Sequence, residues 1–371
     1  MASLVVLPRT FYSSIFRGLQ RMEYNNLIEV FTTALQHGGI LLILLWAQKG
    51  FLEVGYWIAI CYIIKIFLYL ICIPRFFSYL TLVPGFSFWA IKRIIGFVVK
   101  LSSITLFSMF HINADRIIIS KLLPIEEVGF YGVVSGLNSR THLLINSISQ
   151  AAYPSFSALA NDGKQMELMK QYGKLQEILC FALVPVLFFV LFFAKFLFIF
   201  MFDIEIAGIL LLPTICLIVS TYMYGTLVLP HIVALSLGNP GIAVKQNFYG
   251  IFVVLPITIL LIYFFGLTGA AVSKIVYYGF AYFYSVRRIC FECFKSLPKL
   301  WYKEVIKPIS LSVITYVTPL LVLTFLKIEL LLVQIIVYFC TTIAFSIGTY
   351  FIVSEENRKL ISRLGNKLKI F

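Results

Sequence analysis

The chain is a series of long apolar segments separated by short polar stretches. Ten segments reach the length of about 20 mainly apolar residues that a membrane-spanning helix needs. They are residues 27–47, 54–73, 94–113, 128–157, 176–200, 206–237, 246–265, 268–286, 308–326 and 330–353. The third is expected to continue as far as residue 121. The pattern predicts an all-α polytopic membrane protein with about ten transmembrane helices.

The spacing of the segments predicts three parts. Residues 1–93 carry two transmembrane helices, and residues 94–286 carry a six-helix bundle. Residues 287–371 carry a basic cytoplasmic loop, a transmembrane hairpin and a cytoplasmic tail. The composition agrees with this class, because 61% of the residues are hydrophobic and only 12% are charged, against roughly half and a quarter in soluble domains.

The net charge of +14 is best explained by membrane topology. If the N-terminus is cytoplasmic, 21 of the 30 Lys and Arg residues fall in inner segments and 4 in outer turns. Basic residues gather in cytoplasmic loops, so this asymmetry predicts that both termini are cytoplasmic. We therefore expect no nucleic acid partner.

Motifs of several enzyme classes are absent from the sequence. It holds no GxxxxGK[ST], HExxH or GxSxG, and no acidic pair in a predicted cytoplasmic loop that would bind a metal and a nucleotide sugar. Cys290 and Cys293 form a CxxC without a second Cys or His pair, which is a weak sign of a metal or redox site. We expect no enzyme activity, cofactor or metal.

Five basic residues fall within the predicted helices: Lys65, Lys100, Arg140, Lys195 and Lys274. A charge at the centre of a bilayer costs about 2.5 to 3.5 kcal/mol on insertion scales. Lys195 and Lys274 lie near outer ends, where their side chains can extend to the interface. Lys65, Lys100 and Arg140 are instead predicted to line a cationic, substrate-binding cavity.

A polar stripe follows one face of the third helix. Its members recur at steps of three or four residues: Lys100, Ser103, Phe107, His111 and Asp115. We take Asp115 to be the only acid in a helix continuation, with all other carboxylates in loops or at helix ends. Asp115 and His111 are the predicted coupling or gating groups, together with Arg116. Because Arg116 lies about 100° around the helix, we expect it to bind a neighbouring helix or a lipid phosphate.

A second stripe follows the fourth helix and leaves two interpretations open. It comprises Ser135, Asn138, Ser139, His142, Asn146, Ser149 and Gln150. Such residues either line a cavity or form hydrogen bonds between helices. The histidines at positions 37, 111, 142 and 231 also lie in predicted helices. Each is either a proton relay or, as we favour for any one of them, a polar partner of a neighbouring helix.

Four motifs resemble those of the Wzx-type polysaccharide flippases. The stretch ADRIIISKLLPIEEVGFYGVVSGL (114–137) is followed by ISQAAYPSFSAL (148–159). Upstream, FRGLQRMEYNN (16–26) resembles the basic loop before the fifth helix of that family. Downstream, FGLTGAAVSK (265–274) resembles the entry to its twelfth helix. The resemblance spans residues 8 to about 290.

The resemblance implies membership of the multidrug, oligosaccharidyl-lipid and polysaccharide flippase superfamily. Its members have two six-helix bundles around a central cavity, and the Wzx-type flippases move undecaprenyl-diphosphate-linked oligosaccharide across the bacterial inner membrane for O-antigen or capsule synthesis. Residues 27–73 then correspond to helices five and six and residues 308–353 to helices thirteen and fourteen, so the first four helices are expected to be missing. Membrane lipids, polysaccharide polymerase and chain-length proteins are the implied partners, and alternating access is the implied mechanism.

Other functions remain open at this stage. A cation-coupled drug exporter of the same superfamily would favour buried carboxylates, of which we expect almost none. An inactive, truncated flippase is a further alternative. A membrane glycosyltransferase or polymerase would use a long outer loop, whereas no predicted outer loop exceeds about fourteen residues.

Overall fold

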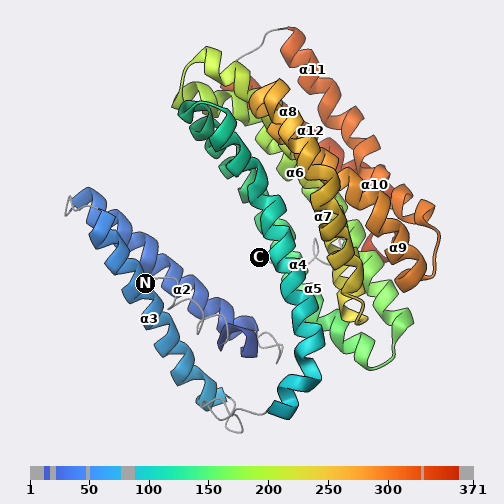
Figure 1. Ribbon diagram of the computed structural model, residues 1–371. Coiled ribbons are helices and arrows are strands. Elements are labelled where there is room, and N and C mark those ends of the chain that lie inside the picture. Colours follow the sequence, from blue (N-terminus) through green and yellow to red (C-terminus); the bar gives the residue numbers. More distant parts are fainter. Residues whose placement is uncertain (1–11, 17–21, 47–50, 77–87, 327–329, 359–371) are drawn as a thin grey trace, which may run out of the picture. The chain divides into compact units, whose positions relative to one another are not determined.

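The protein is helical throughout its regular secondary structure. The computed structural model describes residues 12–16, 22–46, 51–76, 88–326 and 330–358 (Figure 1). Within these ranges every element is a helix, which confirms the predicted all-α class. The chain divides into two compact units, residues 1–93 and residues 94–371.

Unit 1 contains an antiparallel pair of helices. Helix α2 (Met22–Leu41) continues as a π-helical turn, η1 (Leu42–Trp46), and α3 (Phe51–Phe76) follows (Figure 1). A small apolar core lies between them, formed by Ile28, Tyr69 and Ile73 together with Phe16 of the preceding helical segment 12–16. The indole of Trp57 donates a hydrogen bond to the carbonyl of Gln36 at 3.2 Å.

Unit 2 is built on five long helices joined by short turns. Helix α4 (Phe88–Leu122) enters the unit after Arg93. It is followed by α5 (Ile125–Asn161), α6 (Gln165–Met201), α7 (Ile204–Ser236) and α8 (Gly241–Ala281). Helix α7 occupies the centre and packs against α5, α6 and α8 (Figure 1). Its apolar residues are therefore buried on several sides, and α7 supplies much of the wall of the site described below.

The C-terminal part of unit 2 packs on α6. Helix α8 continues through η2 (Tyr282–Val286), α9 (Arg287–Ile289) and η3 (Cys290–Phe294). Then follow α10 (Pro298–Ser312), η4 (Val313–Val317), α11 (Thr318–Phe325) and α12 (Leu331–Ile352). Tyr316 stacks on Phe188 of α6 with 4.6 Å between ring centroids, and the hydroxyl of Tyr338 donates to the carbonyl of Pro185 at 3.1 Å. The predicted hairpin, which α10 to α12 form, is thus part of the same compact unit as the bundle.

Helix α8 is broken near its middle. Gly266 has φ 55° and ψ −131°, a backbone conformation that side chains with a Cβ rarely adopt. The break brings the start of the second half against the end of the first, so that a Cβ added at Gly269 would lie 1.9 Å from the carbonyl oxygen of Leu261. The break falls between the predicted segments 246–265 and 268–286.

This close approach gives a testable prediction. Gly269→Ala is expected to destabilise the protein by about 1–3 kcal/mol, because the new methyl group has to displace backbone atoms. Gly279→Ala, in the same helix, is the matched control, since a Cβ there meets nothing within 4 Å. Thermal unfolding of the purified protein in detergent measures both. Equal stability of the two variants would contradict the close packing at the break.

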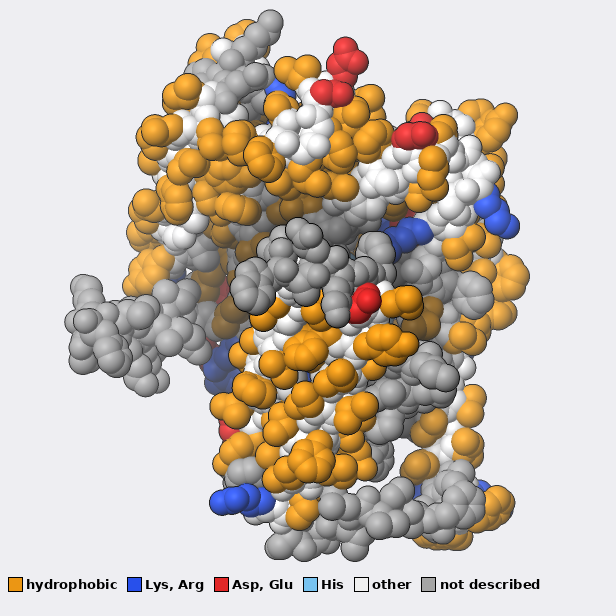
Figure 2. All heavy atoms as spheres, turned by 90° about the vertical axis from the view of Figure 1, so that its left-hand side faces the viewer, with side chains coloured by type: hydrophobic (Ala, Val, Ile, Leu, Met, Phe, Trp, Pro, Cys, Tyr) orange, Lys and Arg blue, Asp and Glu red, His pale blue; other side chains and the backbone are white. Residues whose placement is uncertain are grey.

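Eight helical stretches among the described residues are long and apolar enough to cross a membrane. The ten predicted segments are helical over almost all of their described residues, with residue 47 of the first segment outside the described range. Residues 241–294 form one continuous stretch, and the more polar α5 is not among the eight. Large apolar side chains are exposed along most of the helices. Figure 2 shows one face on which apolar side chains cover most of the described surface. This is the surface of a multi-pass membrane protein.

Candidate functional site

A cavity of about 370 Å³ lies within unit 2, between α4, α5, α7 and α8. Leucine, isoleucine, valine and alanine side chains make up about half of its lining. Its polar lining residues are Ser108, Ser149, Tyr224, His231, Asn239, Gln246, Asn247, Lys274, Tyr277 and Tyr278. Among the lining residues that the structure describes, Lys274 carries the only permanent charge. A pocket that combines apolar walls with convergent polar groups is the usual form of a binding site.

Lys274 forms a buried ion pair with Asp115. The ammonium nitrogen of Lys274, on the second half of α8, lies 3.1 Å from Oδ1 of Asp115 on α4. The hydroxyl of Tyr131, on α5, donates to Oδ2 of the same carboxylate at 2.5 Å. Asp115 is only 3% exposed. Three helices are therefore joined at one carboxylate, and these partners offset the cost of burying it.

A neutral polar network extends along another part of the cavity. Gln246 accepts a hydrogen bond from Ser285, and its Oε1 lies 2.8 Å from Nε2 of His231. Its amide nitrogen donates to the hydroxyl of Tyr277 at 3.4 Å, and Tyr277 donates in turn to Oδ1 of Asn247 at 2.7 Å. The network connects α7 with both halves of α8. It offers amide, hydroxyl and imidazole groups to a polar ligand.

The polar stripe on α5 forms hydrogen bonds between helices at three of its positions, namely Ser135, which accepts from Arg116 of α4, Asn138 and His142. Thr221 of α7 donates to Oδ1 of Asn138 at 2.8 Å, and Nε2 of His142 lies 3.3 Å from the same threonine hydroxyl. The imidazole of His142 also stacks on Tyr224, a lining residue, at 4.9 Å between centroids. Ser149 of the same stripe lines the cavity. Both interpretations of the stripe thus have a structural counterpart.

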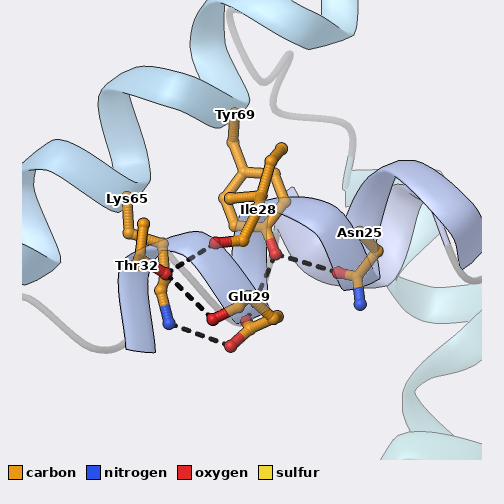
Figure 3. A network of polar contacts seen from close by, with 6 residues as sticks. All are labelled: Asn25, Ile28, Glu29, Thr32, Lys65 and Tyr69. Carbon is orange, nitrogen blue, oxygen red and sulfur yellow. Dashed lines mark hydrogen bonds and ion pairs between the residues drawn. The ribbon is translucent and has the colours of Figure 1, made fainter. Parts of the chain in front are cut away.

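A second buried ion pair joins the two helices of unit 1 (Figure 3). The ammonium of Lys65 lies 2.9 Å from Oε2 of Glu29. The hydroxyl of Tyr69, one turn after Lys65, donates to Oε1 of Glu29 at 3.3 Å and to Oδ1 of Asn25 at 2.9 Å. Lys65 is 3% exposed. Each unit thus contains a carboxylate that binds a lysine through one oxygen and a tyrosine hydroxyl through the other.

The remaining predicted site residues lie elsewhere. Lys100 and Arg140 are exposed, and neither is among the described residues that line the cavity. Arg116 is exposed and donates a hydrogen bond to Ser135 of α5 at 3.2 Å, so that it binds a neighbouring helix. His111 belongs to α4, but its side chain lies outside the described residues. Roles of these residues in substrate binding or coupling remain predictions.

The prediction that all other carboxylates lie in loops or at helix ends is wrong. Glu29 lies within α2, and Glu177 lies within α6 and is only 8% exposed. Lys274, predicted to extend to the membrane interface, has a side chain that is only 18% exposed, and its ammonium pairs with Asp115 inside unit 2. The motif FGLTGAAVSK could have predicted this position of Lys274 from the sequence. The helix breaks at Gly266, so that the lysine lies two turns into a new helix and faces the bundle. Among the described residues no cluster of His, Cys, Asp and Glu would hold a metal ion.

Comparisons with known proteins identify one family. The family described as Polysaccharide biosynthesis protein matches residues 1–203, which is more than half of the chain and extends from unit 1 through α6. A search of curated proteins and a search of solved structures each found no match. The matched residues include Asp115 and Tyr131 and end before Lys274. By this match over more than half its length, the chain belongs to the polysaccharide biosynthesis protein family.

Proposed function

We propose that the protein is a flippase of the Wzx type, which moves undecaprenyl-diphosphate-linked oligosaccharide across the bacterial inner membrane for the synthesis of O-antigen or capsule. The observation that carries this proposal is Lys274, a lysine that faces a polar-lined cavity inside a bundle of membrane-spanning helices. The membership of a polysaccharide biosynthesis family supports the glycan part of the substrate.

The chemistry of the cavity suits such a substrate. A diphosphate carries negative charge that is expensive to bring into a membrane, and a lysine ammonium stabilises it through charge-assisted hydrogen bonds. The neutral network of Gln246, Asn247 and Tyr277 offers hydrogen-bond partners to sugar hydroxyls. The apolar remainder of the lining suits a lipid substrate, whose tail can stay in the bilayer while the head crosses.

The proposal has two further parts. Transport would proceed by alternating access and without enzymatic chemistry, with the lysine-lined cavity facing each side in turn. Both termini would be cytoplasmic, as the distribution of basic residues predicts. The candidate contacts for the anionic headgroup remain Lys65, Lys100 and Arg140. We add Lys274 to them, because it lines the cavity.

A flipping assay tests the proposal. The full chain is reconstituted into vesicles with a polyprenyl-diphosphate disaccharide that carries a fluorophore on its sugar, and a membrane-impermeant quencher reports the fraction that reaches the outer leaflet. We expect faster exchange with the protein than in empty vesicles. Lys274→Gln is expected to lower the rate at least tenfold, the equivalent of about 1.4 kcal/mol. Lys299→Gln, at an exposed position in α10, is expected to leave the rate unchanged.

The outcomes separate the alternatives. Exchange at the rate of empty vesicles would contradict flipping by this chain and favour an inactive member of the family. Extrusion of a lipophilic cation such as ethidium, with no movement of the diphosphate probe, would favour a drug exporter. Equal rates for the Lys274 and Lys299 variants would remove Lys274 from the proposed site.

A further inference from the structure

Lys274 stands between the cavity and Asp115. It lines the cavity of about 370 Å³, and it also lines a small void of about 20 Å³ to which Asp115 contributes. Asp115 is not among the described residues that line the larger cavity. Its side chain is 4% exposed and that of Lys274 is 18% exposed. A ligand in the cavity therefore contacts Lys274, which separates it from the Asp115 carboxylate.

We propose that an anionic headgroup in the cavity replaces Asp115 as the partner of Lys274, and that the released carboxylate then takes up a proton. This inference rests on the proposed function, because it assigns the anion to the diphosphate of the substrate. The ammonium turns from Oδ1 of Asp115 to a phosphate oxygen, and one proton from the solvent converts the carboxylate into a neutral acid. No other bond changes.

The surroundings of Asp115 favour this exchange. A buried carboxylate that loses its counter-ion is strongly destabilised in a low-dielectric interior, and protonation relieves that penalty. Tyr131 can remain a hydrogen-bond partner of either form, since its hydroxyl both donates and accepts. Neutral groups complete the small void: Thr258 and Ser273 of α8, together with Tyr277.

Other titratable groups near the pair are few among the described residues. Arg116 is next to Asp115 in the chain, but its guanidinium is exposed and donates to Ser135. His142, on α5, lies close enough to Lys274 to feel its charge and is bonded to Thr221. Tyr278 of α8 lies close enough to Asp115 to feel its charge. None of these takes the place of Lys274 as a counter-ion in direct contact with Asp115.

Calorimetry tests the inference. Farnesyl diphosphate is titrated into the full-length protein in detergent, in two buffers of different ionisation enthalpy at the same pH, and the difference in heat gives the protons exchanged. We expect uptake of about one proton per bound ligand for the wild type. Asp115→Asn is expected to bind with no proton uptake, because an amide is close to the carboxylate in shape but does not titrate. Lys274→Gln is expected to bind at least tenfold more weakly.

A second ligand and an infrared measurement separate the possible causes of the proton uptake. Inorganic pyrophosphate with the same proton uptake would show that the anion alone drives the exchange, and uptake with farnesyl diphosphate only would assign it to a lipid headgroup. Infrared difference spectra of the wild type should show a protonated carboxyl band on binding, which does not depend on the fold of any variant. Binding without proton uptake and without this band would overturn the inference and leave the flippase intact. Failure of both diphosphates to bind would instead contradict the proposed function.

Discussion

Lys65→Ala is expected to destabilise unit 1 by about 3–5 kcal/mol, because it removes the Lys65 ammonium from the partly buried Glu29 carboxylate. The ion pair is short, at 2.9 Å, and Lys65 is almost fully buried between α2 and α3. Tyr69 would continue to donate to Glu29 at 3.3 Å, but a neutral donor does not replace an ammonium. Thermal unfolding of the purified protein measures the loss.

A double-mutant cycle isolates the pair from other effects. Glu29→Gln combined with Lys65→Met removes both charges and is expected to recover most of the lost stability, since replacing both partners of a buried pair is often close to neutral. Lys100→Ala, at an exposed position, is the matched control and should change little. If Lys65→Ala is as stable as Lys100→Ala, Lys65 is not held by Glu29. A loss of transport without a loss of stability would then support a direct role of Lys65 in substrate binding.

Glu177→Ala is expected to release the segment after α12 from α6 and to destabilise unit 2 by at least about 3 kcal/mol. The buried carboxylate accepts from the backbone amide of Ser354 at 3.0 Å, from the Ser354 hydroxyl at 2.6 Å and from the Asn357 side chain at 2.6 Å. Hydrogen bonds to a charged group contribute about 1.5–3 kcal/mol each, and Asn357 is fully buried. Glu167→Ala, at an exposed position in the first turn of α6, is the control.

Two measurements follow this release. Thermal unfolding gives the loss of stability, and limited proteolysis after residue 353 reports whether the segment has left α6. Unchanged proteolysis in Glu177→Ala would contradict a role of this carboxylate in holding the segment.

The neighbouring Glu356 offers a weaker, pH-dependent contact between the segment and α6. Its carboxyl lies 2.7 Å from the ammonium groups of Lys170 and Lys174, which hold its pKa below the ordinary value. That contribution is present at neutral pH and is lost as the pH falls through the lowered pKa.

The class of protein and the positions of the helices follow from the order of amino acids alone. A run of apolar residues long enough to cross a bilayer has to be helical there, because the backbone finds no other hydrogen-bond partners. Each of the ten predicted segments is therefore helical, including the two halves of α8 on either side of Gly266. Short motifs also indicated a polysaccharide biosynthesis family, because they occur along the chain in the same order as in the proteins that they resemble.

Which charged residues pair with each other depends on how the helices pack in three dimensions. Helical periodicity places Asp115 and Lys100 on one stripe, but it cannot say which of them faces another helix. Glu29 and Lys65 are 36 residues apart, and Asp115 and Lys274 are 159 residues apart. Their pairing depends on helix rotation and on the break at Gly266, which aims Lys274 into the bundle. A buried charge is stable only next to its partner. The packing of the helices therefore determines where these charged side chains can be buried, and the position of a residue along its own helix does not.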